Sequence, residues 1–282
     1  MTGASSRTNG PRRTWLRDLV TFGAVFGALG MVYLLPADTS LSEVKRSGRL
    51  SVCVPDLYPP LVTGDAARPG FDIELLGLVA ERMGLTLAVM PNAAMSRDFN
   101  PRTWRVTRAH CTLLAGGVVL ADRVLSYLDA TGPYLDTGWA VVSAEPLTSL
   151  EGVRVGFFAG LNGLDRLALS RQLRSAGIRA SIVNSAAELE AGLAEGRFDA
   201  GISEALTVRT MAGEHDWHAA WIGDGGERFP VGIGLWKGDL TLKRALSATI
   251  DGLRTEGALD ALMDKYQIAD IEGSIGVGSS SL

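Results

Sequence analysis

The sequence predicts an α/β protein in which two lobes follow an N-terminal apolar segment. Three observations lead to this prediction. Strand-like and helix-like segments alternate along the chain, which is typical of parallel sheets. A polar seam over Ala144–Gly152 separates two such alternating units. The chain has 282 residues, a length that suits about two domains.

The N-terminal segment predicts export from the cytoplasm. Arg12, Arg13 and Arg17 precede an uncharged apolar run from Leu19 to Leu35. As a helix this run would be about 25 Å long, near the lower limit for spanning a bilayer. The basic residues place its start in the cytoplasm, and the segment from Arg12 to Arg17 also resembles a twin-arginine export signal. We expect a cytoplasmic tail over 1–18, a transmembrane anchor or cleaved signal over 19–35, and a periplasmic remainder held at the inner membrane.

The first alternating unit begins with a β-rich strand. Strands are predicted over Arg49–Val54, Leu85–Met90, Cys111–Ala115 and Trp139–Ser143. A helix is predicted over Gly70–Met83, because Leu75, Leu76, Val79 and Met83 form one apolar stripe. Asn100-Pro101 has the pattern of a cap followed by an N1 proline, which predicts a second helix.

The second unit repeats this plan after the polar seam. Ser185 and Glu188 form a capping box that opens a helix ending at Gly196. The Gly/Ser-rich end of the chain, Glu272–Leu282, is predicted to be disordered. The remaining strands are Val153–Phe157, Ile178–Val183, Asp199–Ile202 and Val231–Trp236, and the remaining helices are Leu164–Ala176, Leu240–Glu256 and Ala258–Tyr266.

Composition limits the function classes. The net charge of −4 argues against a nucleic-acid partner, which would favour a basic field. Three His and two Cys are too few for a rich metal framework. His215 and His218 have a spacing that suits a metal on a helical turn, and an exposed loop is the alternative that we favour. We expect no metal and no cofactor. In an exported protein Cys53 and Cys111 are a candidate disulfide, and two buried free thiols are the alternative.

The order of motifs resembles a known family, the bacterial extracellular solute-binding proteins of family 3. The resemblance covers about 48–268. It rests on Gly70-Phe71-Asp72, Ala121-Asp122-Arg123, Gly132-Pro133-Tyr134 and Gly196-Arg197-Phe198-Asp199-Ala200. It implies the two-lobe periplasmic-binding-protein fold, with two crossing strands and a ligand cleft. Lobe one would comprise 48–143 and 236–270, lobe two 144–235, and 271–282 a disordered tail. The implied sheet order also places Cys53 and Cys111 on neighbouring strands.

The resemblance also implies a site. In this family an arginine holds the ligand carboxylate, and Arg123 falls at that position. Glu204 falls where the family carries the acid that accepts from the ligand ammonium, and Tyr58 falls on the aromatic that stacks the ligand. The alternatives are a solvated arginine, an acid at a helix N-terminus and an aromatic packed in a turn.

Three further positions depart from the family pattern. Gly116 and Val118 match positions where the family offers hydroxyl and backbone groups, and neither residue carries a hydroxyl. Asn162 lies in the lobe-two turn that meets the ligand, where its side chain can still form a hydrogen bond. This cleft is less polar than an amino-acid clamp, and buried unpaired charge is costly. The ligand is therefore expected to be a small carboxylate or an amino-acid-like molecule, captured for an ABC permease.

Two other functions remain open on the same fold. Some relatives accompany periplasmic quinoprotein alcohol dehydrogenases, and they resemble this chain around Cys53 and Cys111. The chain would then be an accessory protein with a dehydrogenase as its partner. Other proteins of the fold are dehydratases, which need a general acid in the cleft. Glu204 is the one obvious candidate for that acid, so we expect a binding protein rather than an enzyme.

Overall fold

The computed structural model describes residues 15, 18–27, 37–96, 101–160, 164–223, 228–268 and 271–277. The chain divides into two compact units, Met1–Asp38 and Thr39–Leu282, which are described separately. In the first unit, 18–27 is helical and its apolar side chains are exposed. Of the predicted membrane helix over 19–35, the described part, 19–27, is helical, and residues 28–36 lie outside the described residues. Among the described residues, no helix has the length and apolar character needed to cross a bilayer.

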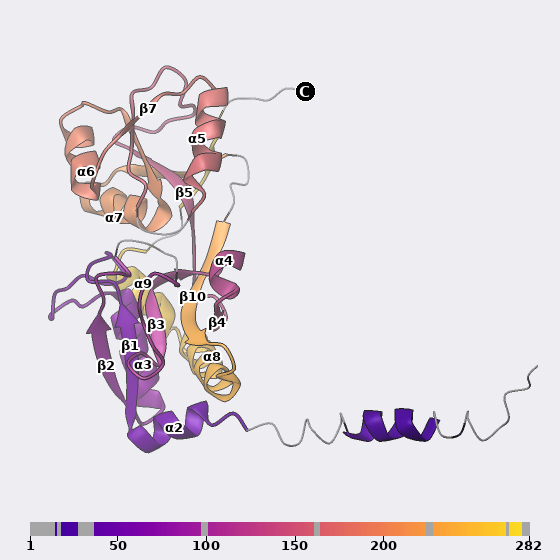
Figure 1. The fold of residues 1–282 in the computed structure, drawn as a ribbon. Coiled ribbons are helices and arrows are strands. Elements are labelled where there is room, and N and C mark those ends of the chain that lie inside the picture. Colours follow the sequence, from indigo (N-terminus) through magenta and orange to yellow (C-terminus); the bar gives the residue numbers. More distant parts are fainter. Residues whose placement is uncertain are drawn as a thin grey trace, which may run out of the picture. The chain divides into compact units, whose positions relative to one another are not determined.

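The first lobe is built on a mixed sheet (Figure 1). Its strands run in the order β2 (Thr86–Pro91), β1 (Arg49–Val54), β3 (Leu113–Val119) and β10 (Arg228–Trp236). β1 is parallel to β2 and β3, and β10 is antiparallel to β3 and to the short β4 (Leu128–Ala130). The helices of this lobe are α2 (Ser40–Ser47), α3 (Phe71–Arg82), α4 (Asp122–Leu125), α8 (Leu240–Thr255) and α9 (Ala258–Lys265).

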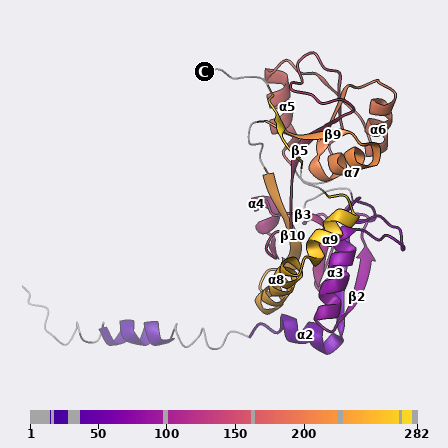
Figure 2. The same cartoon turned by 180° about the vertical axis from the view of Figure 1, so that it is seen from behind.

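Helices cover one face of this sheet. Figure 2 shows α3, α8 and α9 together in front of the strands. Leu75, Leu76 and Val79 of the predicted apolar stripe are completely buried in this core. The helix begins directly after Gly70, where an added Cβ would lie 2.3 Å from the carbonyl oxygen of Leu61. Only glycine permits so close an approach of two backbone segments.

The second lobe has a sheet of its own with helices on both faces. Its strands run β11 (Ser274–Ile275), β9 (His218–Ile222), β5 (Leu135–Ser143), β8 (Ala200–Glu204), β6 (Val155–Phe157) and β7 (Ala180–Ile182). Along β5, Ala140 and Val142 belong to one core cluster and Val141 to another. Successive side chains of a strand face opposite sides, so the sheet separates two cores. Figure 1 shows α5 (Arg166–Ser175) on one face and α6 (Ala186–Ala194) and α7 (Ala205–His215) on the other.

Two long strands, β5 and β10, belong to both lobes. The first half of β5, from Leu135 to Gly138, pairs with β10, whereas its second half pairs with β8 and β9. β10 continues into the first lobe, where it pairs with β3 and β4. The resemblance implied two crossing strands, and β5 and β10 have that arrangement.

Most predicted elements are found, and their ends shift by a few residues. The N-cap half of the predicted capping box is confirmed, because the Ser185 hydroxyl accepts from the backbone N–H of Glu188 at 3.1 Å. The Glu188 carboxylate accepts from the N–H of Asn184, at 2.8 Å. The helix predicted from Asn100-Pro101 is wrong: 101–110 holds only turns and bends, and Asn100 lies outside the described residues. Trp104 is almost completely buried and Arg105 has a φ of 53°, so packing overrides the local helix signal.

The predicted disordered tail also differs from the structure. Ile271 and Ile275 are buried in the second lobe, and β11 pairs in parallel with β9. The two isoleucines give this Gly/Ser-rich segment enough apolar surface to dock. Residues 278–282 lie outside the described residues.

Candidate functional site

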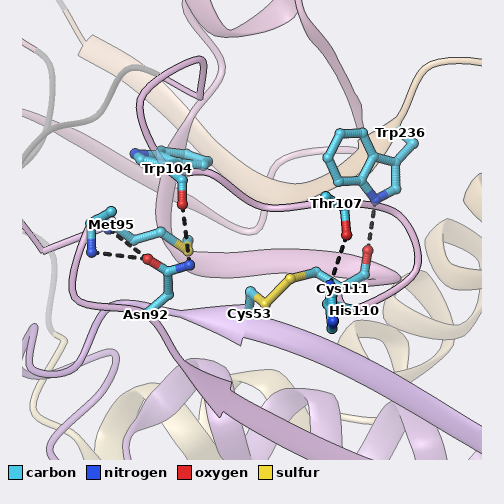
Figure 3. Close-up of a disulfide and its surroundings, with 9 residues drawn as sticks. Cys53, Asn92, Met95, Trp104, Thr107, His110, Cys111 and Trp236 are labelled. Carbon is cyan, nitrogen blue, oxygen red and sulfur yellow. Dashed lines mark hydrogen bonds between the residues drawn. A yellow bond between two sulfur atoms is a disulfide. The ribbon is translucent and has the colours of Figure 1, made fainter.

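A disulfide closes the first lobe near the end of β1. Cys53 lies on β1 and Cys111 lies just before β3, and their Cα atoms are 5.4 Å apart in a closed bridge. The predicted disulfide is thus confirmed, and the alternative of two free thiols is wrong. Figure 3 shows the bridge beside Trp236, whose indole N–H donates to the carbonyl oxygen of Cys111 at 2.6 Å. Trp104 packs in the same core cluster.

Two successive glycines in β3 bring the backbone close to the loop after β1. Gly116 and Gly117 have φ values of 88° and 86°. A Cβ on Gly116 would lie 2.3 Å from Cδ of Pro55, and a Cβ on Gly117 would lie 2.6 Å from Cε1 of Tyr58. The family resemblance placed Gly116 among the ligand-binding positions. In the structure, its N–H donates to Oδ2 of Asp72 at 2.6 Å.

Asp72 is the acceptor that organises this region. Its carboxylate is completely buried and accepts from the Tyr134 hydroxyl at 2.7 Å, as well as from Gly116 and Gly117. Burial raises the pKa of Asp72 to about 6, and the three hydrogen bonds lower it by less than burial raises it. Sequence reasoning placed Asp72 in a motif but gave it no role. Its position directly after an aromatic at a helix start was the available signal.

Tyr58 and Val118 have different environments. The Tyr58 ring is buried, packs against Gly117 and lines the pocket described below. Val118 is almost completely buried in the cluster around Cys53 and Cys111. Its side chain therefore supports the core of the first lobe rather than a cleft. Asn162 lies outside the described residues.

Arg123 is exposed on the short helix α4. Within the described part of the chain, no hydrogen bond or ion pair of its guanidinium is found. It acts electrostatically on Asp165, which is the N-cap of α5 in the second lobe. The backbone N–H groups of Ala168 and Leu167 hold the pKa of Asp165 below its ordinary value, and the charges of Arg171 and Arg123 add to this effect. The charge of Arg123 is therefore near enough to act on the start of α5.

Glu204 is engaged within the chain. It is the N-cap of α7 and is completely buried. Its Oε1 accepts from the backbone N–H and the hydroxyl of Thr207 at 2.8 and 2.7 Å. Its Oε2 accepts from the N–H of Leu206 at 2.9 Å and from the Thr137 hydroxyl at 3.0 Å. A carboxylate offers about four acceptor positions. The structure thus gives Glu204 the role of an acid at a helix N-terminus, and an ammonium group would have to displace one of these donors.

One pocket of about 340 Å³ is lined by both lobes. The loop after β1 contributes Leu57, Tyr58 and Pro59, and the second lobe contributes residues before α5 and from α6 and α7. Of the predicted ligand residues that the structure describes, only Tyr58 lines it. Sequence reasoning missed the others, because helix-surface residues carry no motif. The second-lobe lining consists of Phe158, Ala186, Glu190, Thr207, Thr210, Met211 and Glu214.

Two carboxylates give this inter-lobe pocket a negative rim. Nε2 of His215, the last residue of α7, lies 2.6 Å from a Glu190 oxygen, and the His215 ring stacks on Trp217. Glu214 is exposed. His218 begins β9, so the two histidines predicted as a metal pair or an exposed loop belong to separate elements. No cluster of potential metal ligands is found in the described ranges of the chain.

Comparisons with known proteins agree with this architecture. A chain 23% identical over 240 residues is the L-cystine-binding protein TcyJ of Escherichia coli, matched over 82% of this chain and 87% of the relative. The open, unliganded L-cystine solute receptor of Neisseria gonorrhoeae superposes with a TM-score of 0.64 at 19% identity, covering 82% of this chain and 97% of the receptor. An ancestral cationic amino acid solute-binding protein superposes with a TM-score of 0.65 at 18% identity, covering 80% and 99%.

The family model of the bacterial extracellular solute-binding proteins, family 3, matches residues 50–269. The match includes both lobes and both crossing strands, which is most of the chain. The two-lobe fold, the disulfide-closed first lobe and this match lead to one assignment. The chain belongs to the bacterial extracellular solute-binding proteins of family 3.

Proposed function

We propose that the chain captures a small amino-acid-like ligand between its lobes in the periplasm and delivers it to an ABC permease. The observation that carries this proposal is the inter-lobe pocket. Residues of both lobes line it, so a ligand bound there touches both lobes at once. Such a ligand favours the closed arrangement, which is how two-lobe proteins signal occupancy.

The charges around the pocket support an amine-bearing ligand. Glu190 and Glu214 line the pocket, and none of the arginines and lysines that the structure describes does. Leu57, Phe158 and Met211 offer an apolar surface for a ligand body. A plain carboxylate would meet two like charges here, so it is disfavoured relative to a ligand with an ammonium group. Arg123, exposed on α4, does not line this pocket. The family resemblance alone proposes it as the partner for a ligand carboxylate.

The test is calorimetric titration of the full chain with the common L-amino acids, L-cystine and simple dicarboxylates. Thr210 lines the pocket and its hydroxyl donates to the Leu206 carbonyl at 3.0 Å. Thr210→Trp fills the pocket and is expected to weaken ligand binding at least about 30-fold. The matched control is Thr255→Trp on α8, because Thr255 is exposed and makes the same kind of backbone bond, to Asp251. Equal affinity in both variants would refute the pocket as the site.

One alternative is an accessory protein of a periplasmic quinoprotein dehydrogenase. Two predicted ligand-binding residues, Glu204 and Gly116, form hydrogen bonds within the chain, which favours a protein that binds no small ligand. This alternative predicts no heat of binding from any ligand in the panel. It also predicts that the dehydrogenase is retained by the immobilised full chain and released by salt.

A further inference from the structure

The second lobe carries a groove on the side away from the inter-lobe pocket. It measures about 660 Å³ and lies between α5 and β7. Its floor and walls are mainly apolar, and the two most exposed large apolar side chains of the described residues line it. Leu167 is 71% exposed and Ile182 is 79% exposed. The apolar lining consists of Phe157, Ala159, Leu167, Leu169, Leu173, Ile178, Ala180 and Ile182.

Arginines surround this apolar surface. Arg166, Arg174 and Arg179 line the groove, and Arg171 lies on the same helix. The sequence holds no Asp or Glu from 166 to 187, although the whole chain has a net charge of −4. The acid that precedes this stretch, Asp165, is bound to the first turn of α5 through the N–H groups of Leu167 and Ala168. The groove is therefore a local positive field on an acidic protein.

The groove also has an open strand beside it. β7 is the edge of the second sheet and, in the described residues, pairs only with β6. Exposed edge strands are usually protected from pairing with other strands by short length or by charged residues. β7 has both features, because it is short and Arg179 comes just before it. β7 thus forms one wall of the groove and is too short to pair along its edge with a long strand of another protein. A docked segment would find apolar side-chain contacts and arginine partners here, with few backbone bonds.

We propose that this groove docks an acidic linear segment of a partner protein, with apolar side chains in the groove and carboxylates on the arginines. Charge complementarity selects this occupant. A symmetric dimer that paired this groove with itself would bring like charges together, because the same arginines would meet. A membrane surface is flat and would contact Leu167 and Ile182 without filling the concave floor. The surface is separate from the ligand pocket and does not depend on the proposed function.

The probe is a fluorescent peptide of about ten residues with leucines at two spaced positions and Glu or Asp at the others. One comparison peptide replaces every acid by Lys, and another replaces both leucines by Ser. Anisotropy with the full chain should show binding of the acidic leucine peptide that weakens as NaCl rises from about 50 to about 500 mM. The lysine peptide should not bind, and the serine peptide should bind at least about tenfold more weakly.

Arg174→Glu with Arg179→Glu should weaken the acidic peptide at least about tenfold. The matched control is Arg46→Glu with Arg244→Glu, which makes the same charge change at exposed positions on α2 and α8. Equal weakening of peptide binding in both double variants would mean that the net charge of the protein causes the effect, and it would overturn the proposal. Equal binding of the lysine peptide, or no peptide binding, would also overturn it. Binding to anionic phosphatidylglycerol vesicles without binding to the peptide would reassign the groove to a membrane surface.

Discussion

The hydroxyl of Tyr134 donates a hydrogen bond to Oδ1 of Asp72 at 2.7 Å, and both side chains are buried in the first lobe. The other oxygen of Asp72 accepts from Gly116. One carboxylate therefore joins the first turn of α3, the glycine turn of β3 and the segment that leads into β5. The loop that carries Tyr58 packs against the same glycines. A change in the charge of Asp72 should consequently alter the packing of both the Tyr58 loop, which lines the pocket, and the crossing strand β5.

The first prediction concerns the pH dependence of stability. Burial raises the pKa of Asp72 to about 6 from an ordinary value of 3.8. The folded state then holds a proton that the unfolded state has lost, so the stabilising contribution is complete below the unfolded pKa and disappears as pH rises through about 6. From pH 5 to pH 7 the free energy of unfolding should fall by about 1 kcal/mol through this group.

Asp72→Asn should abolish that slope while keeping an oxygen for Gly116. Urea unfolding of both proteins across this range is the measurement. Glu74, Asp129 and Asp199 have lowered pKa values, so their stabilising contributions are lost only at lower pH, as those groups become protonated. An identical slope in the variant would mean that Asp72 is already ionised at pH 5.

The second prediction concerns the disulfide. Cys53 and Cys111 close a loop with a sequence separation of 58 residues. In the chain-entropy model, such a bridge stabilises by about 4 kcal/mol by restricting the unfolded state. Replacing both cysteines by Ser should lower the free energy of unfolding by about that amount. The Ser variant should also be indifferent to dithiothreitol, and a wild-type protein equally indifferent would contradict the prediction.

The third prediction separates the capping role of Glu204 from a ligand role. Glu204→Gln removes the charge at the start of α7 and turns one acceptor oxygen into a donor that faces N–H groups. We expect a loss of about 2 kcal/mol in the free energy of unfolding. Glu214→Gln is the control on the same helix, because Glu214 is exposed, and it should change stability by less than about 0.5 kcal/mol. Unchanged stability with lost ligand affinity would restore the family role of Glu204.

The fourth prediction concerns Arg123. Arg123→Ala should leave the unfolding curve unchanged, because the side chain is exposed and holds no ion pair in the described residues. A carboxylate-bearing ligand should bind at least about 30-fold more weakly. Arg171→Ala is the control, since Arg171 also acts on Asp165 but lies on α5. Equal affinity losses in both variants would indicate a general field effect rather than a direct contact.

The sequence predicted the fold well because its signals are local. The stripe of Leu75, Leu76 and Val79, the Ser185 cap and the strand pattern around Cys53 depend on neighbours within a few residues. The disulfide could be predicted because the N-terminal segment indicated export to an oxidising compartment, where cysteines form disulfides. The helix predicted from Asn100-Pro101 was wrong because the burial of Trp104 determines the conformation of that segment. A local sequence pattern carries no information about such tertiary packing.

The site was harder to predict for the same reason. Glu204 stands where the family places its acid, but the longer side chain folds back onto its own helix and onto Thr137. Nothing in the spacing of Glu204 reveals that Thr137, on another strand, completes its hydrogen bonds. The pocket-lining Thr210 and Met211 look like ordinary helix residues, because only the fold brings them opposite the loop that carries Tyr58.

The docked end of the chain makes a third connection between the lobes, beyond β5 and β10. Ile268 belongs to the core of the first lobe and Ile271 to that of the second. The indole N–H of Trp221 donates to the carbonyl oxygen of Ile271 at 3.0 Å. Three residue steps span at most about 11 Å. Ile268 and Ile271 can therefore separate by no more than this distance, which limits how far the two cores can move apart at this point of the molecule.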